Sequence, residues 1–548
     1  MMNKNKMRKL LCLLIVVTVS AISLFAQTAA KLTPKRPNVL FIVIDDLKPL
    51  IGAYGEKQML TPNMDRLAKM GTIFMSNYAQ QAVCGPSRAS LLTGQRPDVT
   101  KIWDLKTFIR DMNPNIVTLP EYFKRNGYFA IGIGKVFDQR SVDKEADAQS
   151  WSVPYQKIKK DDFAAGFEPP SQSMFQNANT RKLALQFEEE GKKKGLEDSD
   201  LKAYVKSKIF PAWETSENIP DDAYTDGAVA GVAVKTIGEL AKKKEPFFYA
   251  VGFAKPHLPF VAPKKYSDLY DHSKIDLAPF REHSKDGVSL AYPQGDAESG
   301  KPVPRGGELI NGYTASNGNP LDDAANLIPE ETQRNLIHAY YAAVSFTDAQ
   351  VGKLLDELKK QGLDKNTIVV LWGDHGWHLG DHLLWAKHTN FEQATRAPLI
   401  IAAPNYKGNQ KFDGITEFVD VFPTLCEMTG LKIPSGLAGE SLVKMLKNPA
   451  VEGKLFAQSQ YPRQKDEVMG YAIRTKRFRY VAWLEKDFRS DALTMNFKQV
   501  GTELYDMQND PNETVNLAAN PKYKAAVEEH KKLLQDLLAK QKKYEVTK

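Results

Sequence analysis

Acidic side chains that directly follow short apolar runs are the first groups in this sequence that could carry chemistry. Asp45 and Asp46 follow one such run, and Asp374 and His375 follow another. Adjacent carboxylates repel each other, so this placement is costly unless a cation or strong hydrogen-bond donors lie between them. Three carboxylates and an imidazole suit calcium, which takes about six to eight oxygen ligands, and the same ligand types also admit magnesium or manganese. A helix cap beside a solvated side chain would explain the Asp45-Asp46 pair equally well.

Cys84 is the second group that could react. It opens the segment CGPSRASLLTG, in which Pro86 suits a first helical turn and Gly94 suits the helix end. A thiol at a helix amino terminus lies where anions are favoured and where its pKa is lowered. The alternative is a small buried cysteine ahead of an ordinary helix. Of the other two cysteines, Cys12 lies in the N-terminal apolar segment and Cys426 is expected to be a core residue.

Four short apolar runs must position these groups, because each run ends in polar residues. The runs span residues 39–44, 128–133, 247–253 and 367–372, and they lead to Asp45, Lys135, His257 and Asp374. Their length and their content of Val, Ile, Phe and Tyr predict strands, which alternate with helical stretches such as 340–358. This order predicts a parallel sheet covered by helices on both faces. Since ligands of such sheets bind beyond the carboxyl ends of the strands, we expect the four polar clusters at one edge.

The rest of the chain divides into insertions and a smaller C-terminal part. Residues 157–208 are highly charged and favour a helical insertion, and residues 283–322, rich in Gly, Pro, Asn and Ser, favour a long loop. Further on, the pattern changes to shorter strand-like runs followed by a helix at about 521–542. We therefore predict a catalytic domain over 34–441 and a C-terminal domain over 442–548 that contains antiparallel strands and a helix.

The N-terminal segment and the composition bound where the protein works and what it binds. Residues 1–27 combine four basic residues, an apolar run and small residues, which predicts a secretory signal peptide. That run is too short for a comfortable membrane span, and no other segment is long and apolar enough. Four of the eight net positive charges lie in this signal, so the mature chain suits an anionic ligand without indicating a nucleic-acid binder. We expect a periplasmic or extracellular protein, with the lysosome as the alternative; few cysteines and one glycosylation sequon, at Asn512, favour a periplasm.

A linear motif around Cys84 resembles the signature of a known enzyme family. The run CGPSR, from Cys84 to Arg88 and followed by ASLLTG, looks like the sulfatase signature Cys-x-Pro-Ser-Arg. Further segments resemble the iduronate-2-sulfatase branch of that family: VIDDLKPLIGAYG, NYAQQAVCGPSR, GKVF, AVGFAKPHLPF, DHGWHLGDHLLWAKHTNF, AQSQYPR and MGYAIRT. They run from about Asn38 to Leu517. The resemblance implies an alkaline-phosphatase-like α/β fold with a large, mixed, mostly parallel sheet.

The resemblance also implies a set of site residues. In sulfatases the motif cysteine is oxidised to formylglycine (3-oxoalanine) by a separate formylglycine-generating enzyme, and the hydrated aldehyde is the nucleophile. The residues that would bind calcium are Asp45, Asp46, Asp374, His375 and the modified Cys84. Arg88 would hold the aldehyde hydrate. The residues that would contact the sulfate group are Lys135, His257 and Lys387, and His257 is the predicted acid for the leaving alkoxide. Of the four histidines within residues 374–388, His375 alone is expected to be a ligand.

The chain departs from the family pattern at three positions near the expected pocket. Asp138 stands where a histidine usually helps to deprotonate the hydrate. We place Asp138 among the substrate-facing residues, where it either takes over as base or is simply part of a loop. Lys48 stands in place of the usual arginine, and His378 in place of a small residue. The basic residues that could pair with a substrate carboxylate are Lys48, Lys387, Arg463 and Arg474.

Together these features predict a secreted, calcium-dependent sulfuric ester hydrolase. By resemblance, its substrate is a 2-O-sulfated uronic acid at the end of a glycosaminoglycan-type oligosaccharide, cleaved exolytically. An algal sulfated polysaccharide is the alternative substrate class. The competing functions are a phosphoesterase of the same fold, with an unmodified Cys84 or another nucleophile, and a non-catalytic binder of sulfated glycans, which Asp138 keeps open.

Overall fold

The computed structural model describes residues 36–546, except for 168–174, 198–199, 202–203, 206–207, 209–212, 218, 293–327, 465–466 and 486–497. Residues 38–548 form one compact unit. The predicted signal peptide lies outside the described residues, as does most of the loop predicted over 283–322. Within the described residues, no helix combines the length and the apolar character that crossing a membrane requires.

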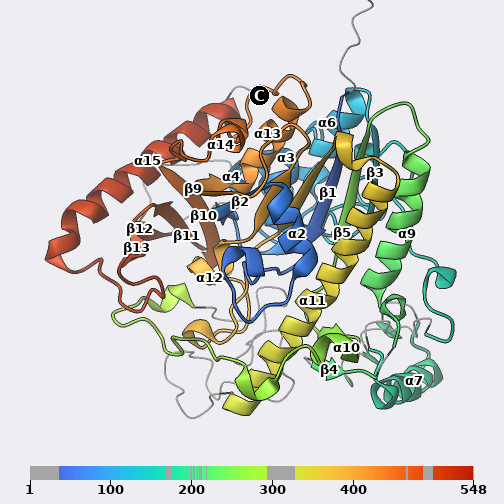
Figure 1. Cartoon of the computed structure of the whole chain (residues 1–548). Helices are drawn as coiled ribbons and strands as arrows, with labels where there is room; N and C mark the ends of the chain where they lie inside the picture. The colour runs from blue at the N-terminus through green and yellow to red at the C-terminus, as the bar shows by residue number, and fades with distance from the viewer. Residues whose placement is uncertain are drawn as a thin grey trace, which may run out of the picture. The chain divides into compact units, whose positions relative to one another are not determined.

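The largest sheet has seven strands (Figure 1). In spatial order they are β3 (Phe129–Gly134), β5 (Phe247–Phe253), β1 (Asn38–Ile44), β7 (Thr367–Gly373), β8 (Leu399–Ala402), β2 (Thr72–Tyr78) and β9 (Gln410–Glu417). Neighbouring strands are parallel, except that β8 runs antiparallel to both β7 and β2. The four predicted strands correspond to β1, β3, β5 and β7, which lie side by side. The predicted mixed, mostly parallel sheet is confirmed.

Helices cover both faces of this sheet. Successive side chains of a strand point to opposite faces, and those of β1 are apolar on both, so each face needs a covering layer. The even-numbered apolar residues of β1 lie in one core cluster with α2 (Pro62–Met70), α9 (Thr225–Leu240) and α11 (Glu330–Lys360). The odd-numbered ones lie in a second cluster with α3 (Cys84–Thr93), α6 (Leu119–Arg125) and α13 (Val421–Met428). Cys426 of α13 is fully buried in the second cluster, which confirms it as a core residue. Neither Cys84 nor Cys426 forms a disulfide.

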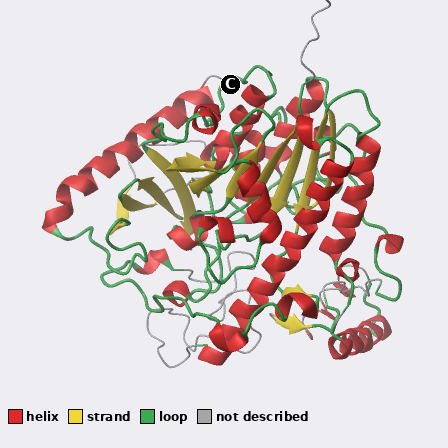
Figure 2. Ribbon diagram, viewed as in Figure 1, coloured by secondary structure: helices red, strands yellow, loops and turns green. Residues whose placement is uncertain are grey.

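A second sheet follows in the chain and contains four antiparallel strands (Figure 2). They are β10 (Phe456–Arg463), β11 (Val468–Thr475), β12 (Phe478–Glu485) and β13 (Lys498–Asp506). Helix α15 (Lys524–Val546) packs through Leu534 and Leu538 against a face that includes Met469 and Tyr471. The predicted antiparallel strands and final helix are confirmed, although β10 had not been predicted as a strand. The domain boundary at 441/442 stays a prediction.

Shorter elements complete the described part of the chain. They are α4 (Pro97–Thr100), α5 (Ile109–Met112), α7 (Ala178–Lys193), α10 (Lys264–Ser267), α12 (Glu392–Thr395) and α14 (Val443–Lys447). Helix α7 lies in the region predicted as a helical insertion. Strands β4 (Trp213–Thr215) and β6 (Phe260–Ala262) pair in parallel as a two-stranded sheet.

Candidate active site

The carboxyl ends of the central strands bring polar residues together at one edge of the sheet. Asp45 donates its backbone N–H to the last carbonyl of β5 at 3.1 Å, and Lys135 donates to the preceding β5 carbonyl at 3.0 Å. Asp374 donates to the last carbonyl of β1 at 3.2 Å. Because these ladders continue one residue beyond the strands, the register of the sheet fixes the three residues beside one another. The predicted convergence at one edge is confirmed.

Nine residues at this edge are termed the site cluster. They are Asp45, Asp46, Cys84, Arg88, Lys135, His257, Asp374, His375 and Lys387. These are the nine residues that the sequence predicted to bind the metal or to act in catalysis. Each of their side chains lies close to at least one other member of the cluster.

Cys84 lies inside the site cluster because α3 begins at this residue. Its Sγ is 3.4 Å from Asp45 Oδ1 and 3.4 Å from His375 Nε2. It is also 3.6 Å from Lys387 Nζ and 3.8 Å from Lys135 Nζ. Burial, followed by the charge of Asp45, raises the pKa of the Cys84 thiol well above its ordinary value. The expected lowering of this pKa is therefore wrong for the unmodified cysteine, because burial and the charge of Asp45 raise it.

The two adjacent aspartates are fully buried, and each has its own cationic partners. Asp45 accepts hydrogen bonds from Arg88 Nη2 at 2.7 Å and from Lys135 Nζ. Asp46 accepts from Lys387 Nζ at 3.0 and 3.2 Å. Asp46 adopts a φ of 56°, a left-handed conformation that aspartate tolerates better than most residues. Burial raises the pKa of Asp46 well above its ordinary value despite Lys387, whereas Lys135 and Arg88 outweigh burial and hold the pKa of Asp45 low.

His375 shows that the site cluster suits a cation. Its Nδ1 lies 3.0 Å from the Gly376 carbonyl, which assigns the proton to Nδ1 and a lone pair to Nε2. Nε2 faces Asp46 Oδ1 at 3.4 Å and Asp374 Oδ2 at 3.6 Å. Burial and the charge of Lys387 lower the pKa of His375 well below its ordinary value, so Nε2 stays unprotonated. Apart from the weak donor Cys84 Sγ at 3.4 Å, this lone pair faces carboxylate oxygens, and a cation between them would stabilise the arrangement.

The ligand atoms available for such a cation form two overlapping groups. One group comprises Asp45, Asp46, Cys84 and His257, and the other comprises Cys84, Asp374 and His375; within each group the atoms lie within 4.8 Å of one another. Three of the six residues in the two groups supply carboxylate oxygens, so the residues present fit a hard divalent cation. This is a possible metal site of the kind predicted from the sequence.

Arg88 ties α3 to the acids of the site cluster. Its Nε donates to Asp374 Oδ2 at 2.9 Å, and its Nη2 donates to Asp45 Oδ1. Its Nη1 donates to the carbonyls of Lys135 and, at 3.0 Å, Val136. Arg88 therefore holds both carboxylates and the segment after β3 in fixed positions around Cys84.

Lys135 and His257 are the members of the site cluster that solvent reaches. Their side chains are 21% and 23% exposed, whereas that of Lys387 is fully buried, with its Nζ 5.3 Å from the ring centre of Trp377. His257 Nε2 lies 3.9 Å from Asp46 Oδ2. A ligand that enters the site therefore meets Lys135 and His257 first.

Two residues to which the sequence assigned no role, Lys255 and Asp226, fix the loop that carries His257. Lys255 Nζ donates to the carbonyl of His257 at 2.6 Å and to that of Pro259 at 2.8 Å. Asp226, in the first turn of α9, accepts the backbone N–H groups of Ala254 at 2.9 Å and Lys255 at 2.6 Å. Burial lowers the pKa of Lys255 to about 8. The segment AKPHLPF was the only sequence signal for this loop, and nothing in it points to Asp226.

Two of the predicted substrate-binding residues already have protein partners. Lys48 Nζ pairs with Asp381 at 3.5 Å. The buried Arg463 guanidinium donates to the carbonyl of His388 at 2.8 Å and to the carbonyls of residues 290 and 291 at 2.8 and 3.2 Å. Arg474, considered for the same role, pairs with Glu392 at 3.1 Å. Arg463 and Arg474 therefore hold protein groups together and lie outside the site cluster.

Asp138, which stands in place of the usual histidine, is 2% exposed and pairs with Arg140 at 3.0 Å. Burial would raise the pKa of Asp138, but the hydrogen bonds from Arg140 and the charge of Lys135 outweigh it and hold the pKa well below its ordinary value. The pairing makes Asp138 a poor proton acceptor. A role in shaping the loop fits this geometry better than the role of base.

The other histidines near His375 serve as packing or hydrogen-bonding groups. His378 Nε2 lies 2.9 Å from Thr389 Oγ1, and the ring of His382 stacks on a phenylalanine with centroids 4.1 Å apart. His388 Nδ1 lies 2.5 Å from Tyr461 Oη. Of the four histidines within residues 374–388, His375 alone belongs to the site cluster, as predicted.

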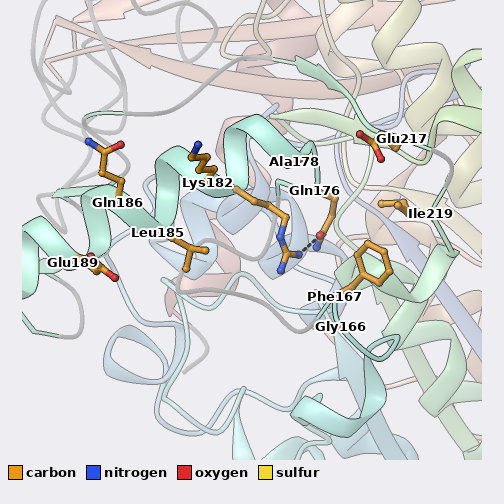
Figure 3. A pocket seen from close by; sticks show the side chains of 11 residues that line it. Gly166, Phe167, Gln176, Ala178, Lys182, Leu185, Gln186, Glu189, Glu217 and Ile219 are labelled. Atoms are coloured by element: carbon orange, nitrogen blue, oxygen red, sulfur yellow. Dashed lines mark hydrogen bonds between the residues drawn. The ribbon is translucent and has the colours of Figure 1, made fainter.

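A separate cavity of about 690 Å³ lies along α7 (Figure 3). Its lining includes Phe167, Gln176, Arg181 and Glu217. None of the lining residues belongs to the site cluster, so this cavity supplies no group to the chemistry described above.

Comparison with known proteins identifies the family. The model of the family "Sulfatase" matches residues 37–431, and that of "N-sulphoglucosamine sulphohydrolase, C-terminal" matches residues 380–541. Human iduronate 2-sulfatase is 32% identical over 568 aligned residues, which cover 92% of this chain and 95% of the human protein. The delta 4,5-hexuronate-2-O-sulfatase of Bacteroides thetaiotaomicron is 26% identical, covering 94% of this chain and 91% of that protein.

Among solved structures, a phosphonate monoester hydrolase of Agrobacterium radiobacter superposes with a TM-score of 0.66 at 24% identity, covering 92% of this chain and 96% of that one. At this identity the similarity establishes the fold only. It shows that the α/β architecture with a second, antiparallel sheet is shared beyond the two relatives above.

Proposed function

Because the chain belongs to the sulfatase family, we propose that it removes the 2-O-sulfate from a terminal uronic acid of glycosaminoglycan-type oligosaccharides. Family membership makes it a sulfuric ester hydrolase. The uronate specificity is supported by the relatives that act at this position, human iduronate 2-sulfatase at 32% identity and the Bacteroides hexuronate-2-O-sulfatase at 26%.

One observation carries the proposal: the motif cysteine lies among two buried aspartates, a third carboxylate and an imidazole. Cys84 Sγ is 3.4 Å from both Asp45 Oδ1 and His375 Nε2. The three carboxylates of the site cluster are matched by three cations, Arg88, Lys135 and Lys387. A bound divalent cation would leave this buried cluster with excess positive charge, which suits an anionic sulfate ester.

We infer that calcium and an oxidised Cys84 complete the site. Asp45, Asp46, Asp374 and His375 would hold calcium together with the modified Cys84. The hydrated aldehyde of a formylglycine supplies an oxygen nucleophile and a second hydroxyl whose deprotonation releases sulfate. A separate formylglycine-generating enzyme would read the CGPSR motif before the chain folds, because Cys84 is fully buried in the folded protein.

The remaining groups of the site cluster would bind and orient the sulfate ester. Lys135 and Lys387 flank Cys84 Sγ at 3.8 and 3.6 Å and would stabilise negative charge on the sulfate oxygens. His257 is held by its backbone at the entrance and would donate a proton to the departing sugar oxygen, a contribution typically worth about a hundredfold to ten-thousandfold in rate. Arg88 keeps two carboxylates in place while the ester enters.

The site of action follows from the N-terminal segment. We propose that residues 1–27 direct secretion, so that the mature enzyme meets sulfated oligosaccharides in a periplasm or outside the cell. Fractionation of cells that express the full chain, followed by N-terminal sequencing of the mature protein, tests this; mature protein that keeps residue 1 would contradict it.

Sulfate release from defined oligosaccharides tests the proposed activity. The protein should be coexpressed with a formylglycine-generating enzyme, and the peptide that contains Cys84 should show the mass of the aldehyde. We expect release of sulfate from a 2-O-sulfated uronate disaccharide, and none by Cys84→Ala. A panel with 6-O-sulfated, N-sulfated and algal oligosaccharides and a phosphonate monoester separates the alternatives. Turnover of the phosphonate alone, by protein that retains the thiol, would favour the phosphoesterase.

A further inference from the structure

The turn that follows β1 carries Asp46 in an unusual backbone conformation. Asp46 has a φ of 56°, which lies in the left-handed region. A residue other than glycine persists there only where the surrounding structure holds it, because the conformation itself is unfavourable. The side chain of Asp46 is also one of the proposed calcium ligands. The contacts that hold this backbone therefore decide where a ligand carboxylate points.

Two side chains from distant parts of the sequence hold this backbone. Asp374 Oδ1 accepts the N–H of Asp46 at 2.9 Å. The hydroxyl of Tyr340 donates to the carbonyl of Asp46 at 2.7 Å and accepts the N–H of Lys48 at 3.1 Å. One hydroxyl thus bridges the turn from residue 46 to residue 48. Asp374 is itself a proposed ligand, whereas Tyr340 lies outside the site cluster.

Tyr340 is itself fixed where it makes this contact. It lies in α11, a helix of 31 residues that covers one face of the large sheet (Figure 1). Its side chain is fully buried, and its ring packs edge-on against that of Phe260, with centroids 5.3 Å apart. A long helix in the core therefore supplies an anchor for the turn that carries Asp46.

We propose that Tyr340 is a positioning residue for the metal: by fixing the backbone of Asp46, its hydroxyl directs the Asp46 carboxylate toward the cation. The inference rests on the proposed function, because it takes calcium as the ion of the site cluster. The hydroxyl is engaged by two backbone groups and supplies no ligand atom itself, so its effect is expected on calcium affinity.

The two adjacent ligand aspartates differ in how much support they need. Asp45 continues the hydrogen-bond ladder of the sheet, since its N–H donates to the last carbonyl of β5 at 3.1 Å. Asp46 lies one residue beyond and turns into the left-handed region. A carboxylate that is already held in its binding position loses less conformational entropy when the ion binds. Asp46 is therefore the ligand whose contribution depends on a contact such as that of Tyr340.

A purely structural role has to be separated from this one. A hydroxyl that satisfies a buried carbonyl and a buried N–H stabilises the fold wherever it occurs. Tyr54 is the matched case, because its hydroxyl donates to the carbonyl of Leu399 at 3.0 Å and accepts the N–H of the same residue at 2.8 Å. Its other acceptor, at 3.2 Å, is the carbonyl of Phe74, so these partners belong to β8 and β2 and not to the site cluster.

Calcium titrations of the parent, Tyr340→Phe and Tyr54→Phe test the proposal, with each protein made alongside a formylglycine-generating enzyme. Phenylalanine keeps the ring and removes only the hydroxyl, so in a chelator both variants should lose a few degrees of Tm. By isothermal titration calorimetry, the calcium Kd of Tyr340→Phe should rise roughly 10- to 100-fold, as for loss of a group that supports a metal ligand. That of Tyr54→Phe should stay within about twofold of the parent. A lowered Tm with an unchanged Kd in Tyr340→Phe would overturn the proposal.

Excess calcium provides a second measurement on the same variants. In Tyr340→Phe, the calcium concentration for half-maximal sulfate release should rise by the same factor as the Kd. At saturating calcium, kcat should return to within about threefold of the parent, because mass action restores the occupied site. Saturating calcium also favours the folded state, so a destabilised variant stays measurable. A kcat that remains more than about tenfold low under these conditions would mean that Tyr340 acts otherwise than through calcium affinity.

The outcomes also separate this inference from the proposed function. If the parent binds calcium and hydrolyses the uronate disaccharide, and Tyr340→Phe binds calcium equally well, only the role of Tyr340 is overturned. If the parent binds calcium and Tyr340→Phe binds it more weakly, but neither releases sulfate from the uronate, the proposed substrate is wrong and the positioning role stands. If the parent binds no divalent cation, the metal assignment and the role of Tyr340 fail together.

Discussion

The chain buries two clusters of charged side chains, and they differ in which ligand atoms they gather at one point. The second cluster, termed the Arg96 cluster, comprises Arg96, Glu417, Asp420 and Lys454. Glu417 Oε1 accepts from Arg96 at 2.7 Å and from a backbone N–H at 2.9 Å, and its Oε2 accepts from Arg96 and Lys454, both at 2.8 Å. Asp420 accepts backbone N–H groups at 2.8 Å on each oxygen. Every carboxylate oxygen in this cluster therefore has a donor.

The site cluster is built differently from similar residue types. Asp45 and Asp46 are adjacent in sequence, and the lone pair of His375 faces the oxygens of Asp46 and Asp374 at 3.4 and 3.6 Å. Burial raises the pKa of Asp374 to about 7, although Arg88 opposes the shift. The carboxylate oxygens of the site cluster also have donors in the protein, so its distinguishing feature is that carboxylates, an imidazole lone pair and a thiol lie close together, as ligands of a divalent cation would. The predictions below test this distinction.

The largest expected effect is the loss of activity in Asp374→Asn. The substitution removes a proposed calcium ligand, so sulfate release should fall by roughly a thousandfold or more. Without added metal, the free energy of unfolding should change by less than about 1 kcal/mol, because burial raises the pKa of Asp374 to about 7 and thus disfavours its charged form, and Arg88 keeps Asp45 at 2.7 Å as a partner. Kinetics with the uronate disaccharide and urea denaturation in a chelator measure the two quantities. A stable variant with parental activity would refute the metal assignment.

The opposite pattern is expected for Glu417→Gln in the Arg96 cluster. The amide removes the negative charge that Arg96 and Lys454 share, and loss of one partner of a buried ion pair typically costs about 3 to 5 kcal/mol. Denaturant unfolding should show this loss, while kcat per folded molecule at 25 °C stays within about twofold of the parent. Lost activity with unchanged stability would mean that the two clusters are not functionally distinct.

A graded effect is expected for His257, the exposed member of the site cluster. In His257→Ala, kcat on the sugar sulfate should fall by about a hundredfold or more, because an alkoxide leaving group needs a proton. The loss on 4-nitrophenyl sulfate should be smaller, since nitrophenolate departs without one. Lys454→Met is the matched control in the Arg96 cluster, where the side chain is 13% exposed, and it should lower stability alone. Equal losses on both substrates would remove His257 from the role of acid.

Local patterns in the sequence predicted four strands of the large sheet, whereas the full membership of the site cluster followed from the resemblance of its motifs to the sulfatase family. Four apolar runs ending in polar residues identified β1, β3, β5 and β7 and the edge where their ends meet. The antiparallel direction of β8 was not predictable in this way, since a short apolar run carries no information on direction. Likewise, the pKa of Cys84 depends on how deeply α3 is buried, which the motif does not encode.

Residues that act through long-range contacts escaped the sequence. Asp226 fixes the backbone at Ala254 and Lys255 across 28 and 29 positions, and Arg463 reaches carbonyls more than 70 positions away. The partner of such a side chain is set by the tertiary fold, so its residue type alone gave a wrong emphasis for Arg463.

The smallest effect, and the most direct comparison of the two clusters, is stabilisation by calcium. A ligand at a hundred times its Kd stabilises the folded state by about 2.7 kcal/mol, so calcium should raise the Tm of the parent by a few degrees. Glu417→Gln should start from a lower Tm and keep the whole calcium shift, because Glu417 is in neither group of candidate ligand atoms. Asp374→Asn should start near the parent and lose most of the shift. Differential scanning calorimetry with calcium and with a chelator measures all three, and magnesium serves as the control for ion type. Equal calcium shifts in the parent and in Asp374→Asn would place the ion elsewhere, and the opposed acceptors around His375 would then need another explanation.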